Sequence, residues 1–208
     1  MKNVSAAYQA ALLGARDGSL VPVTFVWFQA KDRATGLPVE RGFWTWDEDV
    51  QVTVLSGTTG LPVNRTYYGA VSLEVSDIPY VSDLTVQTVT IGMSQIADAA
   101  QQLMRGYDMR LAKCEIHEMT FDTLTGQLSS APEIAFIGEV VGAPIKTPAI
   151  GKDGSIEVSV ISDAISMLTR TNPAKSSHEG QRRRNGDDWG INSSTIKTWG
   201  VPWGKKSS

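Results

Sequence analysis

The sequence is poor in the residues that build metal and redox sites. It has one cysteine, Cys114, and two histidines, His117 and His178, among 208 residues. A single cysteine excludes an internal disulfide framework and a cysteine metal cluster. Alternate residues of a strand point to opposite faces, so His117, three positions after Cys114, cannot bind a metal together with it unless the strand has a bulge. We expect a structural or solvated histidine, no metal and no cofactor.

Long apolar runs and a large excess of one charge are also missing. No apolar run approaches the roughly 20 residues that span a bilayer, so no membrane insertion is expected. Nineteen Lys and Arg stand against 22 Asp and Glu, a net charge of −3 that gives no general electrostatic case for nucleic-acid binding. The first residues favour an amphipathic helix over a signal peptide, and hence synthesis in a reducing cytoplasm.

The motifs of common catalytic sites do not occur in the sequence. There is no GxSxG elbow, no HExxH and no phosphate-binding P-loop. Asp47, Glu48 and Asp49 are adjacent, and such carboxylates can serve a glycosidase or hold Ca²⁺. A solvated or interface-facing cluster is favoured, because no calcium-loop pattern surrounds them. No catalytic residue is predicted, and an enzyme that uses these three carboxylates stays an alternative.

What the sequence does contain is β structure. Apolar and β-branched runs bounded by turn residues predict strands over residues 21–30, 42–55, 64–76, 82–93, 109–122, 133–144 and 156–164. Residues 4–16 predict a helix, and a second helix is expected after Ser94 as N-cap, with Gly106 as its stop. The predicted fold is mainly β, a β-sandwich or barrel with an N-terminal helix, one internal helix and an extended C-terminal arm.

The composition changes at about Asn172. The residues that follow are rich in Gly, Ser, charge and Trp and poor in aliphatics, so they cannot build a core of their own. We therefore divide the chain into a β-rich domain, residues 1–171, and an arm, residues 172–208, that orders by docking on a neighbour. Arg and Trp anchor protein interfaces, and those of the arm are Arg182, Arg183, Arg184, Trp189, Trp199 and Trp203.

One short stretch is repeated. "TGLPVER" at Thr35–Arg41 returns as "TGLPVNR" at Thr59–Arg65. Glycine supplies positive φ, proline fixes φ, and threonine bonds to nearby backbone, which are the roles of turn residues. Each copy stands between strand-like runs, so we interpret the pair as two β-turns at the same end of one sheet. Arg41 and Arg65 are predicted to come close there and to face a partner.

The order of several pieces resembles a known family. The pieces are, in order, "RTYYGAVSLEVSDI", "VSDLTVQTVTIGMSQI", "RGYDMRLAKCEI" and "FIGEVVGAP". This order resembles that of the tail-tip hub (baseplate) proteins of siphophages and gene transfer agents. That family is distantly similar to minor tail protein L of lambda-type phages. The similarity covers about Ala7–Ala164, and "HEGQRRRNGDDWG" is similar to the endings of these proteins. Lambda-type L proteins carry a cysteine-rich region that looks like an iron–sulfur site, and a chain with one cysteine cannot form it.

The resemblance implies a structural subunit of a tail-tip ring around the DNA channel. It would link the tail tube, at the distal tail ring, to the central hub or fibre, as a trimer or hexamer. Its implied partners are copies of itself, the distal tail or tube protein, the hub or fibre protein and the tape-measure protein in the lumen. DNA would pass without specific binding. The implied location is the virion tail tip, after synthesis in the bacterial cytoplasm. From the residues alone, the alternative is a carbohydrate-binding β-sandwich module with exposed Trp44, Trp46, Tyr67 and Tyr68.

Overall fold

The structure is a computed structural model, which describes residues 5–15, 21–80, 85–122, 125–146, 154–165, 177–192, 195, 198 and 200. Contacts within the chain divide it into two units, Met1–Met167 and Leu168–Ser208, which we treat separately. The predicted boundary at 171/172 lies outside the described residues. Among the described residues, no helix is long and apolar enough to cross a membrane.

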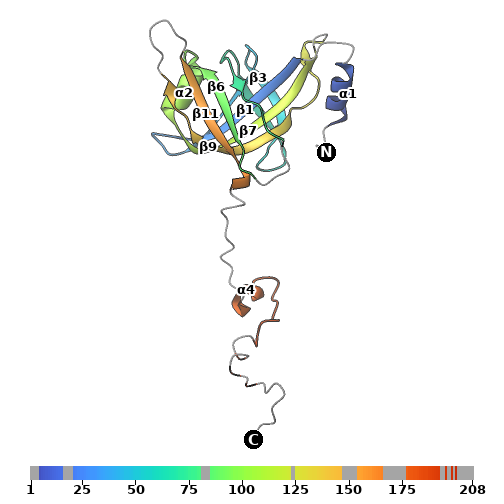
Figure 1. Cartoon of the computed structure of the whole chain (residues 1–208), viewed down its shortest axis with the longest axis vertical. Coiled ribbons are helices and arrows are strands. Elements are labelled where there is room, and N and C mark those ends of the chain that lie inside the picture. The colour runs from blue at the N-terminus through green and yellow to red at the C-terminus, as the bar shows by residue number, and fades with distance from the viewer. Residues whose placement is uncertain are drawn as a thin grey trace. The chain divides into compact units, whose positions relative to one another are not determined.

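The first unit is built on one strongly curved sheet of eleven described strands (Figure 1). Its strand order is β3 (Val50–Leu55), β4 (Pro62–Tyr68), β2 (Pro38–Trp44), β1 (Val21–Asp32), β7 (Tyr107–Asp122), β9 (Glu133–Gly142), β11 (Ser155–Ser162), β6 (Thr88–Ser94) and β5 (Glu74–Val75). In addition, β8 (Gln127–Leu128) pairs with β7 and β10 (Ile145–Lys146) with β11. The order begins at β3 and ends at β5, so the sheet is not closed into a barrel. The predicted mainly β fold is confirmed, in the sandwich-like form.

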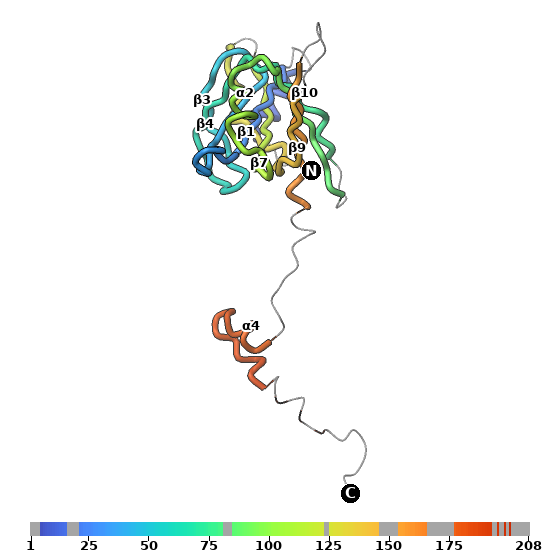
Figure 2. Tube along the Cα trace, turned by 90° about the vertical axis from the view of Figure 1, so that its left-hand side faces the viewer, coloured from blue at the N-terminus to red at the C-terminus, as the bar shows by residue number. Residues whose placement is uncertain are grey.

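Strand β1 is apolar on both faces because both faces are covered. Phe28 points into a larger core with Phe43, Leu103 and Ile116. The alternate residues of β1, including Phe25, point into a smaller core, where the β3–β4 hairpin packs over β1 and β7. Both faces of β1 are therefore buried within this unit. Figure 2 shows β3 and β4 side by side at one side of this unit.

Helix α2 (Asp98–Gly106) closes the larger core with Ala100, Leu103 and Met104. Its predicted N-cap is wrong, because Ser94 pairs with Ser155 and so remains in β6. Ala97 occupies the cap position and makes no side-chain cap bond.

The end of α2 also differs from a glycine reversal. Gly106 is the last helical residue, but Tyr107 continues in extended conformation directly into β7. The guanidinium of Arg33 donates to the carbonyl oxygens of Tyr107 at 2.9 Å and Met104 at 3.3 Å. These bonds satisfy carbonyls that a helix end leaves without a partner.

The N-terminal helix α1 (Ala6–Gly14) is confirmed, with the Ser5 hydroxyl accepting a bond from the amide of Tyr8. In the second unit the structure describes a short helix, α4 (His178–Arg182), capped by Ser177. The sequence did not predict α4. A turn follows it at Asn185 and Gly186, both with positive φ.

Candidate functional site

The repeated heptads form two turns with the same hydrogen bonds. A side-chain oxygen of Asp32 accepts from the amides two and three residues later, at 2.8 and 2.9 Å. Ser56 does the same in the second turn, at 3.3 and 3.4 Å. Gly36 and Gly60 then donate to the carbonyls of Asp32 and Ser56, with φ of 71° and 69°. The two predicted turns are present, but the backbone bond of each closes five residues rather than the four of a β-turn.

Both turns lie at the same end of the sheet, which we call the turn end. Strand β2 starts directly after the first turn and β4 after the second. These two strands pair in parallel, with Gly42 opposite Tyr67. Two parallel neighbours begin at the same end, so residues 32–37 and 56–61 are placed together, as the sequence predicted.

Each turn presents an exposed leucine. Leu37 is 63% exposed and Leu61 is 64% exposed. Further exposed apolar side chains lie on neighbouring strands toward the same end, and we call the whole set the apolar rim: Leu37, Leu55, Leu61, Val63, Leu111 and Val141. Leu111 has a φ of 56°, an uncommon conformation for a leucine. Groups of exposed apolar side chains are typical of interaction surfaces.

A cavity of about 850 Å³ opens beside the first turn. Lys31, Arg33 and Arg110 line it together with Asp32 and Asp108. Its apolar lining is Met104, Met109, Val140, Val141, Ala143 and Ile145. Arg110 pairs with Asp108 at 2.9 Å, which lowers the pKa of that carboxyl to about 2. The turn end thus offers a groove as well as exposed leucines.

Arg41 and Arg65 do not come together, which corrects the prediction. Arg41 donates to the Tyr107 hydroxyl at 2.8 Å, on the side of the larger core. Arg65 lies over the ring of Trp27 at 4.7 Å, on the side of the smaller core. The heptads repeat every 24 residues, but β2 and β4 pair with an offset of 25, Gly42 with Tyr67. A shift of one residue turns a strand's side chains to the other face, so equivalent arginines face opposite ways.

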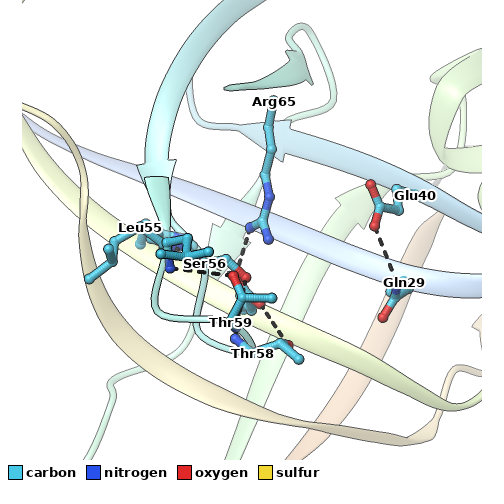
Figure 3. A network of polar contacts seen from close by, with 10 residues as sticks. Gln29, Glu40, Leu55, Ser56, Thr58, Thr59 and Arg65 are labelled. Carbon is cyan, nitrogen blue, oxygen red and sulfur yellow. Dashed lines mark hydrogen bonds and ion pairs between the residues drawn. The ribbon is translucent and has the colours of Figure 1, made fainter. Parts of the chain in front are cut away.

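Arg65 is held in a buried ion pair with Glu115 of β7. Its Nη1 lies 2.6 Å from the Oε2 of Glu115, and both side chains are almost fully buried. The hydroxyl of Thr58 donates to Oε1 of the same carboxylate at 3.2 Å. Figure 3 shows Arg65 pointing from β4 toward the second turn. Burial by itself raises the pKa of Glu115, but bonds from Arg65 and the Gly57 amide outweigh it and keep that pKa below its usual range.

This ion pair therefore fixes the second turn to the sheet rather than facing a partner directly. His117 supports the same contact, because its Nε2 donates to the carbonyl of Leu55 at 2.9 Å. Burial lowers the pKa of His117, so the ring is neutral. Cys114 lies on the opposite face, in the larger core, as expected. Among the described residues, no group of three or more His, Cys, Asp or Glu is arranged to hold a metal ion.

The predicted sugar-binding aromatics are not on one surface. Trp44 is 5% exposed and Tyr67 is fully buried. Burial raises the pKa of Tyr67 to about 12. Tyr68 is half-buried, and Trp46 remains exposed. These four aromatic side chains cannot form one sugar-binding surface, because both faces of β2 and β4 are covered at this point.

The second unit displays the arginines of the arm. Arg182, Arg183 and Arg184 are exposed, and Trp189 is 86% exposed. Asp188 lies 3.9 Å from both Arg182 and His178. Trp199 and Trp203 lie outside the described residues.

Sequence reasoning missed Leu37, Leu61 and Glu115. The two leucines had a signal, an apolar residue at the same tip position of both turns. No local sequence signal pointed to Glu115, because its partner Arg65 is 50 residues away in the chain.

The comparisons with known proteins add no relative to this picture. No protein-family model matches the chain, and no curated protein matches its sequence.

Proposed function

We propose that this protein is a structural ring subunit of a phage-like tail tip, between the tail tube and the central hub or fibre. The observation that carries the proposal is the pair of equivalent turns at one end of the sheet, each with an exposed leucine. The resemblance of the sequence to tail-tip hub proteins names the kind of ring. This surface would then serve assembly with other proteins rather than catalysis.

The energetics favour a partner at the turn end. Full burial of a leucine side chain contributes about 1.5–3 kcal/mol. The two tip leucines alone could therefore supply several kcal/mol to a contact with the next protein layer. The buried ion pair of Arg65 and Glu115 holds the second turn in place before contact, so little conformational entropy is lost on docking.

The open sheet also supports a ring. β3 stands at one end of the strand order, so among the described strands it pairs along one edge only. An unpaired edge is a template for a strand of another chain. Neighbouring copies would meet along the sheet, while the turn end would face the adjoining tail-tip layer. Cyclic symmetry closes such a heterologous contact into a ring, here a trimer or hexamer.

The first test is the mass of the purified full-length chain in solution, with electron microscopy of the particles. We expect a closed trimer or hexamer with a central opening. A chain that stays monomeric at all concentrations would contradict the proposal.

The second test addresses the layer that the turn end contacts. The double variant Leu37→Ser/Leu61→Ser should keep its stability but be lost from assembled tail tips, detected by antibody labelling of virions. Leu12→Ser/Leu13→Ser, which changes two exposed leucines of α1, is the matched control and should be incorporated normally. Normal incorporation of the turn variant would show that the turn end is not the contact.

A further inference from the structure

A second cavity lies at the end of the sheet opposite the turn end. Its volume is about 560 Å³, and we call it the aromatic cleft. Phe121, near the end of β7, pairs with Val21 at the start of β1, which places the cleft far from the turns along these strands. The residues that define it here are Trp46, Glu48, Asp49, Phe121, Gln127 and Leu128.

The cleft has an aromatic wall that is already stacked. The Trp46 ring lies 4.9 Å from that of Phe121, with 21° between their planes, and 6.4 Å from that of Trp44. Trp46 is nevertheless 41% exposed. A large apolar ring that is fixed in place and still exposed can bind a planar group at little entropic cost.

The charge of the cleft is negative. Glu48 and Asp49 are exposed at its edge, and no described residue that lines it is a lysine or arginine. Carboxylates beside an aromatic ring suit one side chain in particular, the guanidinium of arginine. It is a planar cation that stacks on indole faces and forms paired hydrogen bonds with carboxylates.

The two units of the chain carry opposite charge. Met1–Met167 contains 11 Lys and Arg against 19 Asp and Glu, a net charge of −8. Leu168–Ser208 contains 8 Lys and Arg against 3 Asp and Glu, a net charge of +5. A cationic segment with several arginines is therefore supplied by this protein itself.

The described part of the second unit carries side chains that match the chemistry of the aromatic cleft. From the last residue of α4 onward, Arg182–Trp189 hold three consecutive arginines and the exposed Trp189. The Asp187 side chain accepts a bond from the amide of Trp189 at 3.0 Å, which holds the end of this stretch. We call Arg182–Trp189 the Arg/Trp segment.

We propose that the aromatic cleft of one copy binds the Arg/Trp segment of a second copy. An arginine stacks on Trp46 and pairs with Glu48 and Asp49, and Trp189 covers the remaining apolar wall. The proposal rests on the proposed ring, because it requires neighbouring copies, and it adds a second contact between them to the one along the sheet.

The length of the connection suits a neighbouring copy. Eleven residues lie between Ile165, the last described residue after β11, and Ser177. Such a stretch spans at most about 40 Å when extended. That is comparable to the diameter of a domain the size of the first unit, roughly 40 Å. The last residue of β11, Ser162, pairs with Gly138 in the middle of β9, and from there the chain runs toward the end of the sheet that holds the aromatic cleft.

The first experiment cross-links full-length copies that carry one new cysteine each. Gln127→Cys places a thiol at the cleft, and Glu179→Cys places one at an exposed position of α4, shortly before the Arg/Trp segment. We expect a disulfide between the two variants after mixing, because a disulfide requires Cα atoms within about 7 Å. Glu74→Cys, exposed on β5, replaces Gln127→Cys as the control and should not cross-link.

The second experiment measures self-association by sedimentation. Arg182→Gln/Arg183→Gln/Arg184→Gln and Glu48→Gln/Asp49→Asn should each weaken it about tenfold, and more salt should weaken the wild type. Asp49→Asn keeps the oxygen that accepts the Gly69 amide, so the fold is preserved. Glu74→Gln/Asp77→Asn removes the same charge from exposed positions and should have no effect.

The outcomes separate the two proposals. If the wild type and the cleft variants all form rings and no cross-link appears, the cleft contact is overturned but the proposed ring is not. A wild type that is monomeric overturns the ring as well. A cross-link that forms only within one chain carrying both cysteines also overturns the cleft contact, because the segment then occupies the cleft of its own copy.

Discussion

At the scale of single residues, the buried pair of Arg65 and Glu115 is the contact on which the second turn depends most. A surface ion pair contributes little, but a buried charge that loses its partner is strongly destabilising. Glu115 would keep bonds from Thr58 and Gly57 without Arg65, but no cation would remain beside it within this contact.

We expect Arg65→Met to lower the free energy of unfolding by roughly 3–5 kcal/mol, measured by urea denaturation. Arg110→Met, which breaks an exposed pair with Asp108, should leave it nearly unchanged. The double variant Arg65→Met/Glu115→Leu should recover part of the loss, because no unpaired charge stays buried. Equal effects of the two single variants would show that burial does not decide the energetics.

His117 makes stability depend on pH in a defined direction. Its pKa in the folded state is lowered from 6.5 by burial, whereas the unfolded chain keeps an ordinary value. As the pH falls below about 6.5, the unfolded chain takes up the proton first, so stability decreases toward acid. Glu115 adds a similar loss at lower pH, as its own lowered pKa is approached.

We therefore expect the free energy of unfolding to fall between pH 7.5 and 5.5, with a slope that approaches about 1.4 kcal/mol per pH unit. His117→Gln, which keeps an N–H donor for the Leu55 carbonyl, should lose most of this slope. His178→Gln, in the other unit, is the control and should retain it. An unchanged slope in His117→Gln would place the titrating group elsewhere.

At the scale of elements, each turn depends on one glycine in the left-handed region. Open space surrounds Gly36 and Gly60, so a methyl group would meet no neighbour. The cost of an alanine there is purely conformational, about 1–2 kcal/mol.

Gly36→Ala and Gly60→Ala should each lower the unfolding free energy by about 1 kcal/mol, measured by thermal or urea unfolding. Gly14→Ala is the matched control, because Gly14 also has open space around it but ends α1 without positive φ. Alanine there should be neutral or stabilising. A loss at Gly14 as large as at Gly60 would contradict the role of φ.

At the scale of the whole molecule, the first unit should fold without the second. Each unit makes its contacts mainly within itself, and the two cores lie in Met1–Met167. A chain that ends at Met167 should keep its β circular dichroism and its unfolding free energy within about 1 kcal/mol. It should fail to assemble, as judged by sedimentation. Rings of normal size from this truncated chain would show that residues 168–208 are not needed between copies.

Much of the fold could be read from local patterns. Apolar and β-branched runs predicted β1, β7, β9 and β11, and glycine, proline and threonine predicted both turns, because these signals act over a few residues. The start of α2 was misplaced at Ser94, since pairing with Ser155 outweighs the local preference of serine for a cap. The burial of Trp44 and Tyr67 could not be predicted, because it depends on the hairpin β3–β4 folding over β1.

Local sequence patterns alone were sufficient to predict a β protein with two similar turns, one internal helix and a segment rich in arginine and tryptophan. Long-range pairing settled the rest. The one-residue difference between the 24-residue repeat and the register of β2 with β4 sent Arg41 and Arg65 to opposite faces. It placed Arg65 against Glu115, while Leu37 and Leu61 are exposed at the turn end. Register is a property of two strands together, and neither strand's sequence contains it.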